Sequence, residues 1–289
     1  MPDSFTLLDA LHPTRPVRDG KLKVLVTGAA GRIGSYFAMH SESRFDLRLL
    51  CLEGEATGDI DGVGEIQFGD ITNLDDCKQA CDGIDVVLHL AADPSPTATW
   101  DVVQRVNIGG TYNVFAAAKA EGVRRVVYAS SIHAVSGYPR GQQVHASQPV
   151  NPGDLYGVSK CFGEALGRYM AEQEGLQCIA VRIGAFQPPE TAEQPDKLGL
   201  IDGFVSKRDL NQLLQKAIEA EHLRWAVVQA LSDNAFNFMD ITDARWLLDY
   251  EPEDDFTKLN PELRHLHLHK QLVSHNLSQQ GESGLRNDV

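Results

Sequence analysis

The stretch TGAAGRIG (residues 27–34) lies between a predicted strand and a predicted helix. The strand is the short apolar run LKVLVT (residues 22–27), and the helix is indicated by the composition of residues 32–40. The spacing G-x-x-G-x-x-G permits a tight turn and a close approach of the backbone to a ligand. The start of the helix offers free N–H groups and a partial positive charge to phosphates. This unit therefore predicts a pyrophosphate loop for a dinucleotide cofactor.

Apolar runs and helical segments alternate along the next 150 or so residues. The runs lie at 47–52, 84–90, 126–129 and 178–183, and the clearest helical segments between them lie at 111–121 and 156–174. Strands that alternate with helices form βαβ units and hence a parallel sheet. Nearly continuous apolar strands fit a sheet that is buried on both faces. We therefore expect an α/β fold with a doubly wound parallel sheet.

The chain divides into four expected segments. They are an N-terminal arm (1–20), a dinucleotide-binding domain (21–183), a small substrate-side subdomain (184–250) and a polar C-terminal tail (251–289). The subdomain is expected to contain a loop rich in Pro, Gln and Glu (186–196), a helix (208–221), a strand (225–229) and a second helix (242–248). It is too small for an independent second core.

The charge of the chain disfavours two classes of partner. Lys and Arg number 26 against 40 Asp and Glu, which gives a formal net charge of −14. Such a surface repels nucleic acid backbones and anionic lipid. No run approaches the roughly 18 apolar residues of a membrane span, and the start lacks the basic and apolar order of a secretory signal. We expect a soluble, cytoplasmic protein.

The metal-binding residue types form no convincing site. The five cysteines are odd in number and lack paired C-x-x-C units, so neither a disulfide framework nor a zinc site is indicated. His265, His267 and His269 would share one face of a strand, but no cysteine or carboxylate ligand accompanies them in an obvious site. We expect no metal.

The stretch YGVSK (residues 156–160) carries a second chemical pattern. On a helix Tyr156 and Lys160 lie on one face, and a nearby ammonium favours the phenolate, so we expect a lowered pKa for Tyr156. Ser131 follows the strand 126–129, and the carboxyl ends of parallel strands face the ligand crevice. Ser131 can then donate a hydrogen bond to the substrate oxygen that Tyr156 protonates or deprotonates.

The chain resembles an extended short-chain dehydrogenase/reductase of the NAD-dependent epimerase/dehydratase family, because it carries that family's motifs in the same order. The matching stretches are TGAAGRIG, Gly69-Asp70-Ile71, His89-Leu90-Ala91-Ala92, Asn107, VVYASS and YGVSK, and the resemblance covers about residues 22–250. The segments around Ser131, Tyr156 and Arg182 are most similar to uronate dehydrogenases and related aldose dehydrogenases. The resemblance implies a Rossmann-type sheet and NAD as the cofactor.

The resemblance also implies roles for individual residues. Ser131, Tyr156 and Lys160 would form the catalytic group, and the substrate would contact Ser131, His133 and Tyr156, although His133 could equally be structural. Asp70 and Ile71 would flank the adenine, Ala91 and Ala92 the nicotinamide ribose, and Asn107 a helix-bound water or proton path. The other implied cofactor contacts are Gly28, Ala30, Gly31, Arg32, Ile33, Gly34, Leu90 and Ile183, together with Tyr156 and Lys160.

The end of the second strand bears on cofactor choice. An acidic residue there normally binds the ribose hydroxyls and selects NAD. Cys51 and Glu53 bracket the expected position, and we expect Glu53 to serve. Arg48 is the basic side chain nearby, and on a strand it can point to either face. NADP is therefore disfavoured but not excluded.

Three departures from the uronate dehydrogenases concern the substrate. Ile132 replaces an asparagine, Ala185 replaces a serine, and the loop 186–194 contains no arginine. A guanidinium is the natural bidentate partner of a uronate carboxylate, and only Lys197 or Arg208 remains to replace it. We therefore expect a neutral aldose to be preferred over a uronate.

Three functions compete. A sugar dehydrogenase would transfer hydride from C1 of a cyclic aldose to NAD as Tyr156 removes the hydroxyl proton, giving a lactone. A nucleotide-sugar epimerase or dehydratase would retain its cofactor, but the small subdomain leaves little room for a nucleotide diphosphate. A non-catalytic NAD(H)-binding regulator need not keep Ser131, Tyr156 and Lys160. We favour the dehydrogenase, with a sugar as its small-molecule partner, and expect a homo-oligomer.

Overall fold

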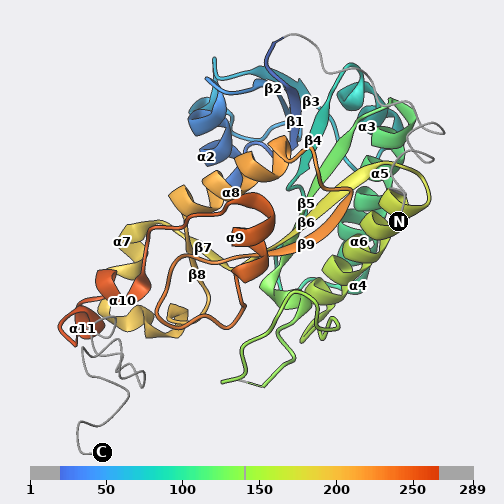
Figure 1. Cartoon of the computed structure of the whole chain (residues 1–289). Helices are drawn as coiled ribbons and strands as arrows, with labels where there is room; N and C mark the ends of the chain where they lie inside the picture. The colour runs from blue at the N-terminus through green and yellow to red at the C-terminus, as the bar shows by residue number, and fades with distance from the viewer. Residues whose placement is uncertain (1–19, 140, 267–289) are drawn as a thin grey trace, which may run out of the picture.

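A seven-stranded, fully parallel sheet forms the centre of the computed structural model, which describes residues 20–139 and 141–266 (Figure 1). Its strand order is β3-β2-β1-β4-β5-β6-β9. The strands are β1 (Lys23–Thr27), β2 (Asp46–Cys51), β3 (Glu65–Phe68), β4 (Val86–His89), β5 (Arg125–Ser131), β6 (Gln177–Ile183) and β9 (Trp225–Ala230). The order reverses between β1 and β4, and in open α/β sheets ligands bind at that switch point. The expected α/β fold with a Rossmann-type sheet is confirmed.

Helices cover both faces of the sheet. On one face α2 (Arg32–Ser41), α8 (Lys207–Glu219) and α9 (Thr242–Leu248) enclose one apolar core. On the other face α3 (Leu74–Cys81), α5 (Thr111–Ala120) and α6 (Leu155–Glu172) enclose the second. The central strands β4 and β5 are buried along their whole length, as the continuous apolar runs predict.

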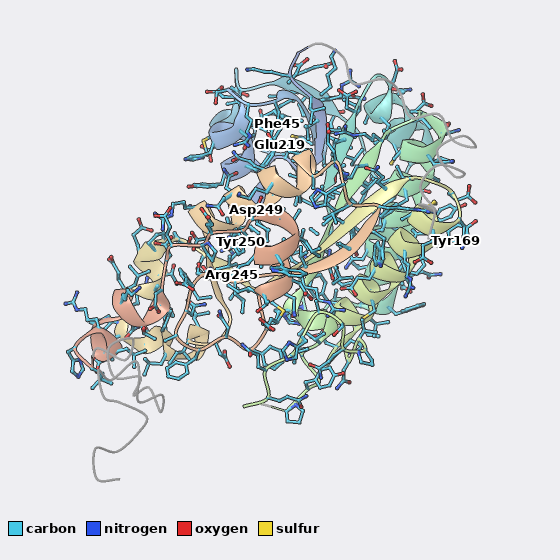
Figure 2. All side chains as sticks on the ribbon, in the orientation of Figure 1. Phe45, Tyr169, Glu219, Arg245, Asp249 and Tyr250 are labelled. Atoms are coloured by element: carbon cyan, nitrogen blue, oxygen red, sulfur yellow. The ribbon has the colours of Figure 1, made fainter. Side chains whose placement is uncertain are left out.

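Shorter elements connect these helices and strands. They are η1 (Gly58–Ile60), α4 (Trp100–Val102), the π-helix η2 (Val103–Gly110) and η3 (Ile132–Ala134). After α9, Asp249 adopts a left-handed conformation with φ of 50°, and the chain turns back toward the core there (Figure 2). The hydroxyl of buried Tyr250 then donates to the carbonyl of Leu231 at 2.9 Å. This turn places the segment after α9 against α8.

Beyond the sheet, a small group of elements stands at one end of the molecule (Figure 1). It consists of β7 (Ala185–Gln187), α7 (Pro189–Ala192), η4 (Pro195–Leu200), β8 (Phe204–Ser206), α10 (Phe256–Leu259) and α11 (Pro261–Arg264). β7 and β8 pair in parallel, and a cluster of Ala192, Phe204 and Phe256 holds the helices to them. This group flanks the carboxyl end of β6.

Two expectations about this region are wrong. Residues 186–196 are not a continuous loop, because Phe186 is buried in β7 and Pro189 starts α7, a position in the first turn that proline favours. Residues 251–266 are not a free tail either. Asp255 and Asn260 cap α10 and α11, and the Phe256 ring packs 5.8 Å from that of Phe204.

Some expectations fall outside the described residues. These are the arm up to residue 19 and the segment after residue 266, including His267 and His269. Within the described ranges, no helix is long and apolar enough to cross a membrane, and no group of three His, Cys, Asp or Glu side chains is placed to hold a metal ion.

Candidate active site

Two glycines of the loop are required by close contacts with the backbone around them. Gly28 has φ of 67°, and a Cβ there would approach the Cα of Ala91 to 2.9 Å. A Cβ on Gly34 would approach the Cα of Ala29 to 2.8 Å. Among the described residues no side chain caps the start of α2, and its first turn is free of acidic residues. The N-terminus of α2 is therefore open to an anion, as a pyrophosphate requires.

A buried histidine fixes the strand end beside this loop. The Thr27 hydroxyl accepts hydrogen bonds from the N–H groups of Leu90 and Ala91, each at 3.2 Å, and lies 2.8 Å from Nδ1 of His89. Since the hydroxyl already accepts twice, it donates to Nδ1, so Nε2 of His89 carries the proton and donates to Thr111 at 3.2 Å. Burial lowers the pKa of His89 to about 3, and the ring stays neutral.

Ser131, Tyr156 and Lys160 come together at the carboxyl end of β5. Ser131 is the last residue of β5, and Tyr156 and Lys160 lie in the first turns of α6. The Lys160 ammonium donates to the Ala129 carbonyl at 2.8 Å and lies 5.3 Å from the centre of the Tyr156 ring. The Ser131 hydroxyl accepts from the N–H of His133 at 3.2 Å, so its proton remains free to donate.

The pKa of Tyr156 differs from the expectation. Burial raises the pKa of its phenol, and a hydrogen bond with Ser131 opposes this only in part. The expected lowering by Lys160 is wrong because the lysine is itself buried, and burial lowers its pKa to about 7. Burial thus works against the protonated form of Lys160. The two side chains have pKa values displaced in opposite directions, as often occurs at functional sites.

His133 is held beside the phenol. Its Nδ1 lies 2.7 Å from Oδ2 of Asp154, and its ring meets the Tyr156 ring edge-on at 5.3 Å. Asp154 also caps α6, because its Oδ1 accepts from the N–H of Gly157 at 2.7 Å. No role was predicted for Asp154, because the predicted helix began at residue 156, one residue later than the observed α6, and an Asp is a typical N-cap only directly before a helix.

Asn107 lies in the π-helix η2 and joins two edges of the site. Its side chain accepts from the N–H of Asp93 at 2.8 Å and donates to the carbonyl of Asp93 at 3.0 Å. It also donates to the Ser159 hydroxyl at 3.2 Å, and that hydroxyl donates to the Tyr156 carbonyl at 2.7 Å. The amide of Asn107 thus fixes structure, and its implied part in a water or proton path remains a prediction.

A buried ion pair supports the same helix. Both guanidinium contacts from Arg182 to the Glu164 carboxylate measure 2.8 Å, and the Ser130 hydroxyl donates to Glu164 at 2.6 Å. Arg182 is on β6, Ser130 on β5 and Glu164 on α6, so the pair fixes α6 across both strands. No sequence pattern indicates this pairing, since its members are far apart in the chain.

Comparison with known proteins decides the family. Residues 24–246 match the NAD dependent epimerase/dehydratase family. The chain belongs to this family. It is 36% identical over 250 residues to an NAD-dependent glucose-6-phosphate dehydrogenase of Haloferax volcanii, covering 80% of this chain and 93% of the relative. An L-arabinose 1-dehydrogenase (NAD(P)(+)) of the same organism is 34% identical over 81% of this chain and 97% of its own.

Solved structures agree with this family. A glucuronic acid dehydrogenase from Chromohalobacter salexigens aligns with a TM-score of 0.74 and 28% identity, covering 88% of this chain and 91% of its own. A variant of the uronate dehydrogenase from Agrobacterium tumefaciens, solved as a complex with NAD, aligns with a TM-score of 0.73 and 28% identity, covering 89% and 92%. NAD is the cofactor of this chain, as expected.

In this type of sheet, an acidic residue at the end of β2 normally binds the adenosine ribose hydroxyls and favours NAD over NADP. Arg48 is directed elsewhere: its guanidinium contacts Glu65 at 3.1 Å and the carbonyls of Ala80 and Asp82 at 3.0 and 2.8 Å. These carbonyls close α3 before β4, at the edge of the sheet opposite the ligand crevice. Glu53 is exposed after β2 and has no hydrogen-bond partner within the described part of the chain.

The other expected adenine contacts follow β3. The Asp70 carboxylate accepts from the N–H of Thr72 at 2.8 Å, and Ile71 is buried against Gly110, where a Cβ would approach its side chain to 2.6 Å. Sequence analysis missed Glu55, whose carboxylate accepts from the N–H of Leu52 at 2.8 Å just beyond β2. Glu55 is therefore a second acidic side chain near the expected ribose site.

The cations left for a uronate are engaged with acidic residues. Lys197 contacts Asp196 at 3.0 Å, and Arg208 contacts Glu253 at 2.9 Å and Asp254 at 3.0 Å. A guanidinium does reach residues 186–194 from elsewhere. Arg32, the first residue of α2, donates to the Phe186 carbonyl at 2.6 Å and to the Gln187 side chain at 3.1 Å. Because Arg32 lies beside the glycine loop, we expect its guanidinium to pair with the cofactor's phosphates and not with a substrate carboxylate.

Proposed function

We propose that this chain oxidises a neutral aldose at C1 to a lactone with NAD as the hydride acceptor. One observation carries the proposal: Ser131, Tyr156 and Lys160 lie together at the carboxyl end of β5, and α2 begins at the same end of the parallel sheet, after β1. The names of the Haloferax volcanii relatives, which are sugar dehydrogenases, support the reaction class. The bound cofactor would supply the hydride acceptor.

The side chains would divide the chemistry as follows. Deprotonated Tyr156 takes the proton of the C1 hydroxyl, and the C–H electron pair leaves C1 as hydride while the C=O bond forms. Ser131 donates a hydrogen bond to the same oxygen and orients it. The Lys160 ammonium stabilises the phenolate, and its low pKa lets it lose a proton near neutral pH. His133 is held by Asp154 next to this oxygen and would contact the sugar.

The residues that would hold the cofactor lie along the carboxyl edge of the sheet. Gly28, Ala30, Gly31, Arg32, Ile33 and Gly34 would hold the pyrophosphate, Glu53, Asp70 and Ile71 the adenosine, and Leu90, Ala91, Ala92, Asn107, Tyr156, Lys160 and Ile183 the nicotinamide half. Residues 21–183 would then be the dinucleotide-binding domain, and residues 184–250 the substrate-side subdomain. The short helices up to residue 264 would complete that subdomain.

We place the enzyme in the cytoplasm, in carbohydrate metabolism, as a homo-oligomer. The formal net charge of −14 supports a partner other than nucleic acid or an anionic membrane. Two large side chains, Tyr112 on α5 and Tyr169 on α6, are 52% and 50% exposed, which supports contact between copies. Figure 2 labels Tyr169 on α6. Size-exclusion chromatography tests the assembly.

Steady-state reduction of added NAD tests the proposed reaction. Neutral aldoses, uronates and glucose 6-phosphate are each supplied with NAD, and NADH is measured. We expect NADH in proportion to the sugar consumed. A family epimerase would retain its cofactor and produce no net NADH, and a regulatory protein would bind NAD without turnover. Either of these two results would contradict the proposal.

A further inference from the structure

Asp93 is held rigidly at the carboxyl edge of the sheet. It follows β4 directly after Ala91 and Ala92, and the side chain of Asn107 bonds its N–H at 2.8 Å and its carbonyl at 3.0 Å. Asn107 is 1% exposed, so this double contact is shielded from water. A backbone fixed on both sides gives the side chain of Asp93 a defined starting direction.

The same amide links Asp93 to the residue that carries the phenol. Asn107 donates to Ser159, and Ser159 donates to the carbonyl of Tyr156. The carboxylate of Asp93 is close enough to Tyr156 for its negative charge to contribute to the raised pKa of the phenol. Asp93 therefore lies near the phenol, on the loop that follows β4.

One oxygen of this carboxylate is available. Oδ1 accepts from the N–H of Ser95 at 2.9 Å, and Oδ2 has no partner among residues 20–139 and 141–266. The side chain is half-buried, so water screens its charge only in part. Asp154, the other carboxylate that acts on Tyr156, already uses both oxygens, for His133 and for Gly157.

An ionised carboxylate with a free oxygen discriminates between substrates by charge. It accepts a hydroxyl hydrogen in a charge-assisted bond, which is stronger than a neutral one. It repels a second anion at the same distance. Lys197 and Arg208, which could offset that repulsion, are paired with acids, and Arg32 is bonded to the Phe186 carbonyl and the Gln187 side chain.

We infer that Asp93 is a specificity-determining residue, whose free oxygen accepts a hydroxyl of a neutral aldose and disfavours sugars that carry a carboxylate or phosphate. The inference rests on the proposed sugar dehydrogenase activity. Asp93 takes no proton from C1; it selects which sugar is presented to Tyr156.

The test compares Asp93→Asn with the wild-type protein. Asparagine keeps the shape and can still accept from Ser95, but it removes the charge. We measure kcat/KM for glucose, arabinose, glucuronate and glucose 6-phosphate, and we expect the preference for the neutral sugars to fall about 10-fold, mainly through KM. Asp82→Asn is the matched control, because Asp82 is exposed at the opposite edge of the sheet. Asp82→Asn should leave the preference for the neutral sugars over the charged ones unchanged.

A second measurement separates this role from a structural one. Removing the charge of Asp93 lowers the pKa of Tyr156, so the acidic limb of the kcat/KM profile should move to lower pH in Asp93→Asn and not in Asp82→Asn. An unchanged substrate ratio in Asp93→Asn overturns the inference while the proposed function stands. So does a weaker affinity for NAD with an unchanged KM for the sugar. A wild-type preference for glucuronate or glucose 6-phosphate overturns the inference and also the neutral aldose named in the proposed function. Absence of NADH with every sugar overturns the proposed function first, and the inference with it.

Discussion

Nδ1 of His133 donates to Oδ2 of Asp154 at 2.7 Å, and Oδ1 of Asp154 caps the helix that carries Tyr156. One carboxylate thus sets both the orientation of the imidazole and the start of α6. Because a carboxylate only accepts, Nδ1 of His133 carries the proton of this bond. The position of His133 and the position of the phenol are therefore coupled.

Asp154→Asn should separate these two tasks. Asparagine is as good an N-cap as aspartate, so the Tm should change little, but its weaker bond to His133 should lower kcat/KM about 10-fold. Asp154→Ala removes the cap as well and should cost about 1 kcal/mol of stability. Thermal unfolding and steady-state kinetics measure both. Full activity in Asp154→Asn would show that His133 needs no carboxylate.

Lys160 should cost the protein stability. Its pKa falls from 10.5 to about 7 on folding, so between these values the unfolded chain binds a proton that the folded chain does not. The penalty is absent above pH 10.5, grows as the pH falls, and is complete below about 7. Lys160→Met should therefore be more stable than the wild type at pH 7, by roughly 2–4 °C in Tm for each kcal/mol recovered, while turnover is lost. A stability difference that does not vary with pH would contradict the burial of an ionisable lysine.

The sequence predicted the sheet and the main site because both depend on local signals. The strand, glycine turn and helix at residues 22–40 are consecutive, and Tyr156 and Lys160 share a helix face by their spacing. The carboxyl end of β5 brings Ser131 to them by the rule for parallel sheets. None of these inferences needs a contact between distant residues.

What the sequence could not show are contacts across the fold. Arg32 meets Phe186 and Gln187 although 154 and 155 positions separate them. The lowering of the Tyr156 pKa was predicted from Lys160 alone, without the burial that raises it. β3 went unpredicted because only half-buried or exposed residues form it. The short helices after residue 255 depend on Phe256 packing against Phe204.

NAD should be used with a higher kcat/KM than NADP. The Arg48 guanidinium contacts Glu65 on the side of the sheet opposite the ligand crevice. The acidic side chains of Glu53 and Glu55 follow β2. A carboxylate there accepts the ribose hydroxyls and repels the extra phosphate. Glu53→Gln should reduce the ratio of kcat/KM for NAD to that for NADP. Glu55→Gln, measured in the same way, is the comparison. A larger effect in Glu55→Gln would move the role to Glu55, and a wild-type preference for NADP would contradict the assignment.

A neutral aldose should be oxidised with a higher kcat/KM than the matching uronate, and added salt should barely change its rate. A uronate carboxylate must be paired when it loses water, and Lys197 and Arg208 are already engaged. A neutral substrate experiences no long-range steering. Faster uronate oxidation that falls steeply with salt would contradict this and point to Lys197 or Arg208 as the cation.

The central claim is that Tyr156 removes the proton as hydride leaves C1, and NADH formation by Tyr156→Phe tests it most directly. Phenylalanine keeps the ring beside His133 and removes only the hydroxyl. We predict turnover on a neutral aldose lowered by roughly 10²-fold or more, with NAD affinity nearly unchanged. Wild-type rates of NADH formation in Tyr156→Phe would contradict the account.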